Sequence, residues 1–347
     1  AADGRGGGAE EGESRRRGFM VSARACCCVL SIYAGQYVTI TLVFVPPFLL
    51  PPAHVLSLYL ALAAAYGWTY FGAPHKTGAR YSPRLTTFMS RWMADAAWGW
   101  FGGVHLVKDS QASLEREKKY VFGYHPHGLC PATAAWIHHT DEWAELFGGV
   151  KPHCLVASVL LYVPVLRELL LISGVRDVGR ASFRRALSEG GSVLVIPGGQ
   201  AELVVDEKRH DRVTLYTRHK GFVREAIIAG AELVPMFCFG ESRALVNAVR
   251  LPALQRWTYR TFGFPVPYIP AGWGAGFLPL PRPLPLAVVV GDPIAVAPPG
   301  GPPAGGPELE ALVEAKVREY YGALEALYEA HKHDYGYGAA SLVLSHH

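Results

Sequence analysis

Residues 120–128 read Tyr-Val-Phe-Gly-Tyr-His-Pro-His-Gly, an apolar and aromatic run that ends in two histidines, a proline and a glycine. A short run of this kind, closed by Pro and Gly, predicts a buried β-strand that leads into a sharp turn. In α/β sheets, catalytic groups gather just beyond the carboxyl ends of the strands. Histidine can take and return a proton near neutral pH, so we expect one of His125 and His127 to do chemistry there. The alternative is a solvated turn whose histidines have no role.

The sequence after Lys119 alternates between strand-like and helix-like segments. Short runs rich in Val, Ile, Leu or aromatic residues, bounded by Gly or Pro, predict strands at 120–124, 154–157, 192–196, 233–239 and 286–290. Helices are expected at 165–172, 182–188 and 222–229, and apolar residues at helical spacing predict a last helix between Leu309 and Tyr328. This alternation favours an α/β fold whose parallel or mixed sheet is flanked by helices.

The segment from Ala25 to His75 contains no Asp, Glu, Lys or Arg. Proline pairs divide it into two apolar stretches, 26–45 and 55–73, each close to the roughly 20 residues that cross a bilayer as a helix. The short linker predicts a transmembrane helical hairpin over 25–75. Basic residues on both sides of it predict that both ends face the cytosol. A signal peptide is disfavoured because its apolar core is shorter, and two buried helices of a soluble core are the other alternative.

The hairpin divides the chain into three parts. Residues 1–24 mix Gly, Glu and Arg and are expected to form a disordered tail. Residues 76–347 are expected to form a cytosol-facing domain. Within it, the stretch 90–101 contains three tryptophans, which suit either a helix at the membrane surface or a packed core helix.

Composition limits the classes of partner. Half of the 347 residues are hydrophobic, and the net charge is only +4. No basic run with interleaved aromatic residues occurs outside residues 15–17, so nucleic acid is not expected as a partner. The six cysteines show no spacing typical of a zinc site or a disulfide framework, so we expect reduced thiols and no bound metal.

A second loop has residues that would complement the histidines. Residues 197–202, Pro-Gly-Gly-Gln-Ala-Glu, follow the third expected strand. If that strand neighbours the first one, both loops open on one crevice. A carboxylate beside a histidine orients the imidazole and stabilises its charged form. Gly198 and Gly199 allow backbone N–H groups to approach a developing oxyanion. The alternative is that Glu202 is a surface carboxylate.

Six motifs occur in a fixed order along the chain. They are His125-Pro-His-Gly128, Pro164-Val-Leu-Arg-Glu168, Pro197-Gly-Gly-Gln-Ala-Glu202, Arg218-His-Lys-Gly-Phe-Val223, Leu233-Val-Pro-Met-Phe-Cys-Phe-Gly-Glu241 and Val290-Gly-Asp-Pro-Ile294. By these motifs the chain resembles, from about residue 104 to 336, the type-2 diacylglycerol acyltransferase family. That family also includes monoacylglycerol acyltransferases and wax-ester synthases. Each motif is weak alone, whereas the six together are specific.

The resemblance implies a glycerolipid-acyltransferase-like fold and acyl transfer from acyl-CoA to the free hydroxyl of diacylglycerol. It assigns the catalytic base to His127 and its partner to Glu202, and it gives His125 a positioning role in a loop with Pro126 and Gly128. The sequence has no Gly-x-Ser-x-Gly elbow and no cysteine in an activating context, so we expect direct attack by the acceptor rather than an acyl-enzyme. Acyl-CoA is a co-substrate, and no cofactor is implied.

Coenzyme A carries several phosphate charges, which favour basic residues at helix starts as its binding site. Arg218, His219 and Lys220 precede a helix-like run and are expected to bind acyl-CoA. Arg180 is a second candidate, for which a solvated helix face is the alternative.

Two further features bear on the site. Arg167 and Glu168 lie in an apolar stretch, where a charged pair must be matched, so we expect a buried structural or site-forming role for them. The family carries a Tyr-Phe-Pro turn where this chain reads Phe101-Gly102-Gly103. This departure leaves the entry loop, and with it the acceptor preference, open.

The expected location is the endoplasmic reticulum membrane, with the lipid-droplet surface as a second one. The expected partners are acyl-CoA, diacylglycerol and the lipid membrane, and a homo-oligomer stays open. Monoacylglycerol or a long-chain alcohol would use the same machinery, so the acceptor also stays open. Two other classes compete. One is a non-catalytic lipid-binding protein, and the other is a metal-dependent hydrolase that uses His125, His127 and a distant carboxylate and that would need a third well-placed ligand such as His138 or His139.

Overall fold

A computed structural model describes residues 41, 45–109, 114–131, 133–164, 166–205, 211–272, 281–296, 301 and 305–346. The α-helices are α2 (Pro46–Leu49), α3 (Pro52–Tyr66), α4 (Pro74–Thr77), α5 (Pro83–Phe101), α6 (Asp141–Leu146), α7 (Leu166–Ile172), α8 (Arg180–Ser188), α9 (Glu202–Val205), α10 (Gly221–Ala229), α11 (Glu241–Ala244), α12 (Pro252–Phe262) and α13 (Gly306–His331). The strands are β1 (Val104–Lys108), β2 (Tyr120–His125), β3 (Pro152–Val156), β4 (Arg176–Asp177), β5 (Ser192–Val195), β6 (Arg212–Tyr216), β7 (Glu232–Phe239), β8 (Val246–Asn247), β9 (Pro270–Ala271), β10 (Leu286–Val290) and β11 (Ser341–Ser345). The 3-10 turns are η1 (Gly67–Tyr70), η2 (Thr133–Ala135), η3 (Ile137–His139), η4 (Ser158–Tyr162) and η5 (Gly199–Ala201).

The main sheet has seven strands in the described part of the chain, in the order β1-β10-β7-β2-β5-β3-β4. The strands from β7 to β4 run parallel, whereas β10 pairs antiparallel with β7. All six residues of β2 are buried, because this strand lies in the middle of the sheet and is covered on both faces. The predicted α/β fold with a mixed, helix-flanked sheet is confirmed.

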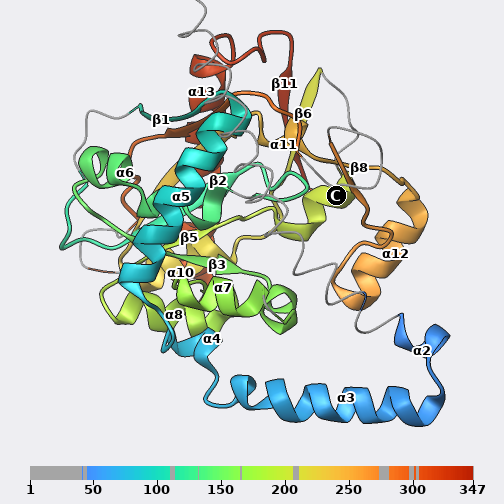
Figure 1. Cartoon of the computed structure of the whole chain (residues 1–347). Helices are drawn as coiled ribbons and strands as arrows, with labels where there is room; N and C mark the ends of the chain where they lie inside the picture. Colours follow the sequence, from blue (N-terminus) through green and yellow to red (C-terminus); the bar gives the residue numbers. More distant parts are fainter. Residues whose placement is uncertain are drawn as a thin grey trace, which may run out of the picture.

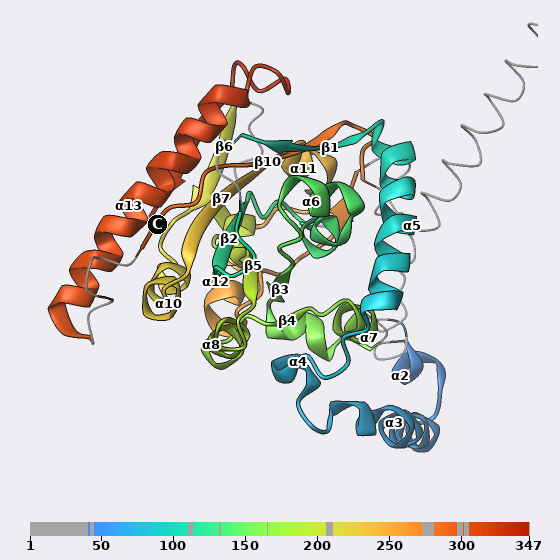
Figure 2. The same cartoon turned by 90° about the vertical axis from the view of Figure 1, so that its left-hand side faces the viewer.

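Helices cover both faces of the sheet, as Figure 2 shows. On one face Val121 packs in a core with residues of α8, α10 and α13. On the other face its neighbour Phe122 packs with Trp100 of α5 and Trp143 of α6. Successive side chains of a strand point to opposite faces, so the apolar run of β2 supplies both cores.

The centre of the sheet brings three loops to one edge. β2 ends at His125, β5 at Val195 and β7 at Phe239. These three strands are adjacent and parallel. Their carboxyl ends therefore lie at the same edge, where the topology of α/β sheets places catalytic and binding groups.

One helix extends away from this domain. Figure 1 shows α3 at the bottom of the molecule, and none of its residues is buried. The stretch Pro52–Thr77 is long and apolar enough to cross a membrane, the one such stretch among the described residues. This helix indicates membrane association. The first predicted span, 26–45, lies almost wholly outside the described residues, so the hairpin stays a prediction.

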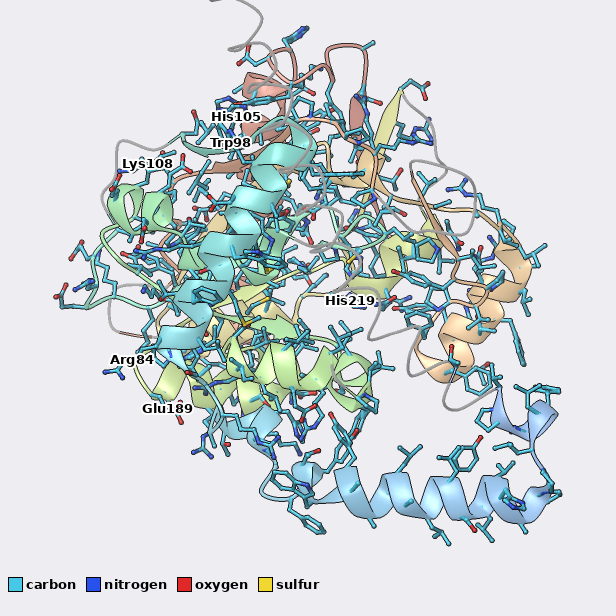
Figure 3. The ribbon with its side chains drawn as sticks, viewed as in Figure 1. Arg84, Trp98, His105, Lys108, Glu189 and His219 are labelled. Carbon is cyan, nitrogen blue, oxygen red and sulfur yellow. The ribbon has the colours of Figure 1, made fainter. Side chains whose placement is uncertain are left out.

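Helix α5 has two different faces. Trp100 is buried and donates its indole N–H to the carbonyl of Pro281 at 3.0 Å. Phe88 and Trp98 are 68% and 56% exposed, and the Trp98 ring lies 5.6 Å from that of His105 (Figure 3). Of the two roles expected for residues 90–101, the core role holds for one face, and the membrane-surface role stays a prediction for the other.

Candidate active site

His125 ends β2 and is fully buried. Its Nε2 lies 3.1 Å from the Tyr320 hydroxyl, which donates to the carbonyl of Gly123 at 3.0 Å. We therefore assign the ring proton to Nε2. Gly123 leaves room for this hydroxyl, since a Cβ there would lie 1.8 Å from its oxygen. Burial lowers the pKa of His125 to about 3, so the ring is neutral near pH 7 and joins β2 to α13.

His127 lies two residues beyond the end of β2 and is 8% exposed. Its Nδ1 lies 2.9 Å from the carbonyl oxygen of Gly128. A carbonyl can only accept, so Nδ1 carries the ring proton and Nε2 keeps its lone pair. Burial lowers the pKa of His127, and the bond to Gly128 raises it by less. The ring is thus neutral at pH 7 and able to take a proton at Nε2, the state that a general base requires.

Glu202 begins α9 and holds the backbone of the histidine loop. It is buried, and its Oε2 accepts the backbone N–H of His127 at 2.6 Å. Its Oε1 accepts the backbone N–H of Tyr216 at 3.3 Å. The bond to the His127 N–H ties this carboxylate to the main chain of the loop, and the expectation that it orients the imidazole directly stays a prediction. Glu202 therefore positions His127 through the peptide that carries it.

The two glycines before α9 have distinct roles. A Cβ on Gly198 would lie 1.8 Å from Oε1 of Glu202, so only glycine leaves space for the carboxylate. The N–H of Gly199 donates to the carbonyl of Ile196 at 3.1 Å and closes the turn. The expectation that Gly198 and Gly199 present N–H groups to an oxyanion stays a prediction.

A cavity of about 180 Å³ opens beside these loops. Pro126, Gly128 and Glu202 form part of its wall. Arginines from four places in the chain also contribute to the wall: Arg212, Arg243, Arg250 and Arg282. Because guanidinium groups bind phosphate and carboxylate well, this wall suits an anionic group. The cavity is smaller than the roughly 300–1,000 Å³ of a typical ligand pocket, so it would hold part of a larger ligand.

The model of the family named Diacylglycerol acyltransferase matches residues 51–345. The chain belongs to the diacylglycerol acyltransferase family. "Diacylglycerol O-acyltransferase 1" of Schizosaccharomyces pombe is 31% identical over 258 residues, which cover 70% of this chain and 72% of that protein. "2-acylglycerol O-acyltransferase 3" of Homo sapiens is 30% identical over 335 residues, which cover 90% and 92%. The crystal structure of the 1-acyl-sn-glycerophosphate acyltransferase of Thermotoga maritima aligns at 14% identity with a TM-score of 0.40, covering 87% of this chain and 97% of that one.

The chain is therefore an acyltransferase, and membership of the diacylglycerol acyltransferase family implies acyl-CoA and an acylglycerol as its substrates. This confirms the family that the six motifs indicated.

The basic residues expected to bind acyl-CoA in this family member lie away from the cavity wall. Arg180 forms an ion pair with Glu225 of α10 at 3.3 Å, which agrees with the alternative of a helix-face role. Lys220 forms an ion pair with Glu314 of α13. Arg218 is exposed. Their role in binding acyl-CoA stays a prediction.

His219 has a different position from the other three. Its Nδ1 lies 3.0 Å from the carbonyl of Pro197, and Figure 3 labels it near the centre of the view. It therefore supports the turn that contains Gly198. This contact links the motif at residues 218–223 to the motif at residues 197–202.

Glu241 is a buried acid to which the sequence analysis gave no role. It begins α11, one residue after the end of β7, and accepts hydrogen bonds from the Thr133 backbone N–H at 3.2 Å and from the Thr133 hydroxyl at 3.0 Å. It also accepts the hydroxyl of Tyr124. Burial raises the pKa of Glu241, and these donors partly offset that rise. Glu241 thus holds the segment that follows the histidine loop; its signal in the sequence was its place at the end of the fifth motif.

Arg167 and Glu168 join α7 to the segment after α3. Arg167 is fully buried, donates to the carbonyl of Thr69 at 2.8 Å, and places its guanidinium 4.5 Å from the ring centroid of Tyr70. Glu168 accepts from Arg80 at 3.1 Å. Of the two roles expected for this pair, these contacts support the structural one.

His138 and His139, the candidate third ligands of the hydrolase alternative, lie on η3. Among the described residues, no group of three or more His, Cys, Asp or Glu side chains is placed to hold a metal ion. His139 Nε2 lies 3.2 Å from the Ser173 carbonyl, and the His138 and His139 rings are 4.1 Å apart. These contacts indicate a structural role for both buried histidines.

Proposed function

We propose that this acyltransferase moves a fatty acyl group from acyl-CoA to the free hydroxyl of diacylglycerol and so makes triacylglycerol. The observation that supports this most is the state of His127, a neutral ring with its proton held on Nδ1 by Gly128. The loop that carries this ring forms part of the cavity wall. Because relatives named for diacylglycerol and for 2-acylglycerol are equally similar, monoacylglycerol is the alternative acceptor, followed by a long-chain alcohol.

The acceptor hydroxyl attacks the thioester directly, so no acyl-enzyme forms. Nε2 of His127 takes the proton of the acceptor hydroxyl as its oxygen attacks the thioester carbonyl. The tetrahedral intermediate collapses, the carbon–sulfur bond breaks, and the leaving thiolate takes the proton back from the imidazolium. An ester and free CoA thiol result. Glu202 contributes by fixing the peptide of His127, because misplacement of a catalytic group is costly in rate.

Acceptor identity is tested by expressing the full chain in a host that cannot make triacylglycerol. Neutral lipids are then separated by thin-layer chromatography after feeding oleate, with or without a long-chain alcohol. Triacylglycerol in the host that carries the active chain, and its absence with the His127→Ala variant, is the expected result. Accumulation of diacylglycerol at the expense of monoacylglycerol, or of wax ester, would assign one of the alternative acceptors.

Replacing Arg282 by glutamine is expected to raise the KM for acyl-CoA by roughly tenfold, because a hydrogen bond to a charged group contributes about 1.5–3 kcal/mol. Arg282 represents the cavity arginines, which we propose as the site of a CoA phosphate. The matched control is Arg180→Gln, whose guanidinium pairs with Glu225. A phosphate-free acyl-pantetheine thioester should be used equally well by both variants. A larger effect of Arg180→Gln on acyl-CoA would instead support the residues expected from the sequence.

We further propose an integral hairpin over 25–75 in the endoplasmic reticulum membrane, with both termini cytosolic. Tags at either terminus should then be cleaved by protease added to sealed microsomes. Sodium carbonate should leave the protein in the membrane, because two spanning helices are held by their apolar surface. Protection of one tag and not the other would mean that only one segment spans, and the hairpin would be wrong.

A further inference from the structure

Helix α12 has polar residues inside and apolar residues outside. Gln255 and Thr258 are each 5% exposed, whereas Leu254 and Trp257 are 41% and 57% exposed. A helix on the surface of a water-soluble domain has the reverse arrangement, with its apolar stripe against the core. The exposed side of α12 therefore requires a partner other than water.

Hydrogen bonds fix α12 in this orientation. The Gln255 side chain donates to the carbonyl of Pro267 at 2.9 Å. The Thr258 hydroxyl accepts the backbone N–H of Val266 at 2.8 Å. Both buried polar side chains are thus satisfied by the segment that follows the helix, and turning the helix to bury Leu254 and Trp257 would break these bonds.

The exposed apolar surface continues beyond the helix. Phe262, Val266 and Ile269 are 69%, 48% and 45% exposed. The rings of Trp257 and Phe262 are in edge-to-face contact, with centroids 5.8 Å apart. Single exposed apolar residues are ordinary, but a set that spans a helix and its following segment marks an interaction surface.

The charges beside this surface indicate which partner it meets. Arg256 and Arg260 are exposed and lie one turn apart, as do Leu254 and Trp257, so a basic row runs beside an apolar row. Tryptophan with arginine is the composition of helices that lie at the boundary of headgroups and acyl chains, where the cations meet lipid phosphates. Figure 1 shows α12 on the side of the molecule toward which α3 extends.

We propose that α12 is a second membrane contact, which lies in the lipid interface. Leu254, Trp257 and Phe262 enter the boundary of the acyl chains, and Arg256 and Arg260 bind lipid phosphates. The apolar helix α3 attaches the chain to the membrane, and α12 sets the orientation of the domain on it.

This contact brings the cavity to the lipid surface. Helix α12 packs against α9, which begins with Glu202. The inner side of α12 supplies Gln255 to the cavity wall. With α12 in the interface, an acylglycerol can pass from the bilayer to the site without crossing water. This consequence rests on the proposed function, whereas the membrane contact itself does not.

The contact is tested with a photoreactive benzophenone amino acid incorporated at position 257 in the full chain. The protein is reconstituted into vesicles of phosphatidylcholine and phosphatidylserine that contain radiolabelled lipid, and then irradiated. The matched control is the same probe at Glu325, an exposed position on α13. We expect lipid adducts at 257 many times more abundant than at 325. A protein–protein adduct at 257 would assign the surface to a second copy of the chain. Absence of any adduct would mean that the surface is exposed to solvent. Either result would overturn the proposal.

Its consequence for catalysis is tested with Trp257→Ser combined with Phe262→Ser. In vesicles this variant should raise the apparent KM for diacylglycerol several-fold, with the KM for acyl-CoA unchanged. Unchanged kinetics would overturn the route from the bilayer. If the wild-type chain transfers no acyl group at all, the proposed function fails, while the adduct measurement still decides the membrane contact.

Discussion

Replacing His127 by alanine is expected to lower kcat/KM for acyl transfer by about a hundred- to ten-thousand-fold, the range typical of a lost general base. The reason is that Nε2 of this ring holds a lone pair while Nδ1 donates to Gly128. The measurement is transfer of labelled acyl groups in microsomes, normalised to protein level. The matched control is His105→Ala, because His105 is an exposed histidine on β1. A His127→Ala variant within threefold of wild type would contradict the assignment.

The pH profile gives an independent check on the same group. Burial lowers the pKa of His127 from its ordinary value of 6.5. The neutral base is therefore present at pH 7 and is lost only as the pH falls through the lowered pKa. We expect the acid limb of log kcat/KM to lie below pH 6.5. A limb above pH 6.5 would mean that another group, or a ring stabilised in its charged form, limits the rate.

Replacing Gly198 by alanine is expected to lower kcat by roughly a hundredfold, although the change adds one methyl group and removes no functional group. The new Cβ would lie 1.8 Å from Oε1 of Glu202, so the carboxylate must move away from the His127 N–H. The matched control is Gly221→Ala at the start of α10, where nothing lies within 4 Å of an added Cβ. The KM for acyl-CoA should change little, because the displaced groups position the base rather than bind CoA.

The companion change is Glu202→Gln. The carboxylate accepts two backbone N–H groups, whereas an amide offers one oxygen and one NH₂ group, so one donor must lose its partner. Combined with His127→Ala, either change should add little further loss, because residues that act as a unit are not additive. Multiplicative losses in the double variant would show that Glu202 acts independently of His127.

The elements that the sequence predicted correctly are those with a strong local pattern. β2 and β10 are unbroken apolar runs, and α13 repeats apolar residues at helical spacing, so both types could be recognised without knowing their neighbours. β6 and β11 were missed because, in the described part of the chain, they form a separate two-stranded sheet whose strands are far apart in the sequence. Helix α12 was missed because periodicity analysis assumes an apolar inner face, whereas this helix buries Gln255 and Thr258.

The loops after β2 and β5 could be predicted to lie side by side, because these strands are adjacent and parallel. The atoms that meet could not be predicted, because a sequence does not indicate whether the Glu202 carboxylate reaches the His127 ring or a main-chain N–H. Tyr320 was placed on the apolar face of the last helix, and nothing local indicated that its hydroxyl would reach His125. The one available signal was Gly123, a glycine inside a buried strand, which often marks close approach of another group.

Arg167 determines whether the enzyme can be separated from its anchor. A chain shortened to exclude α3 and η1, in search of a water-soluble enzyme, would lose the Thr69 carbonyl and the Tyr70 ring from a fully buried guanidinium. Each lost bond to a buried charge costs about 1.5–3 kcal/mol, against a total stability of about 5–15 kcal/mol for a typical domain. The η1 turn that follows the anchor helix is therefore part of the folding unit of the enzyme domain. Soluble enzyme would have to keep residues 69–80, or carry methionine in place of Arg167.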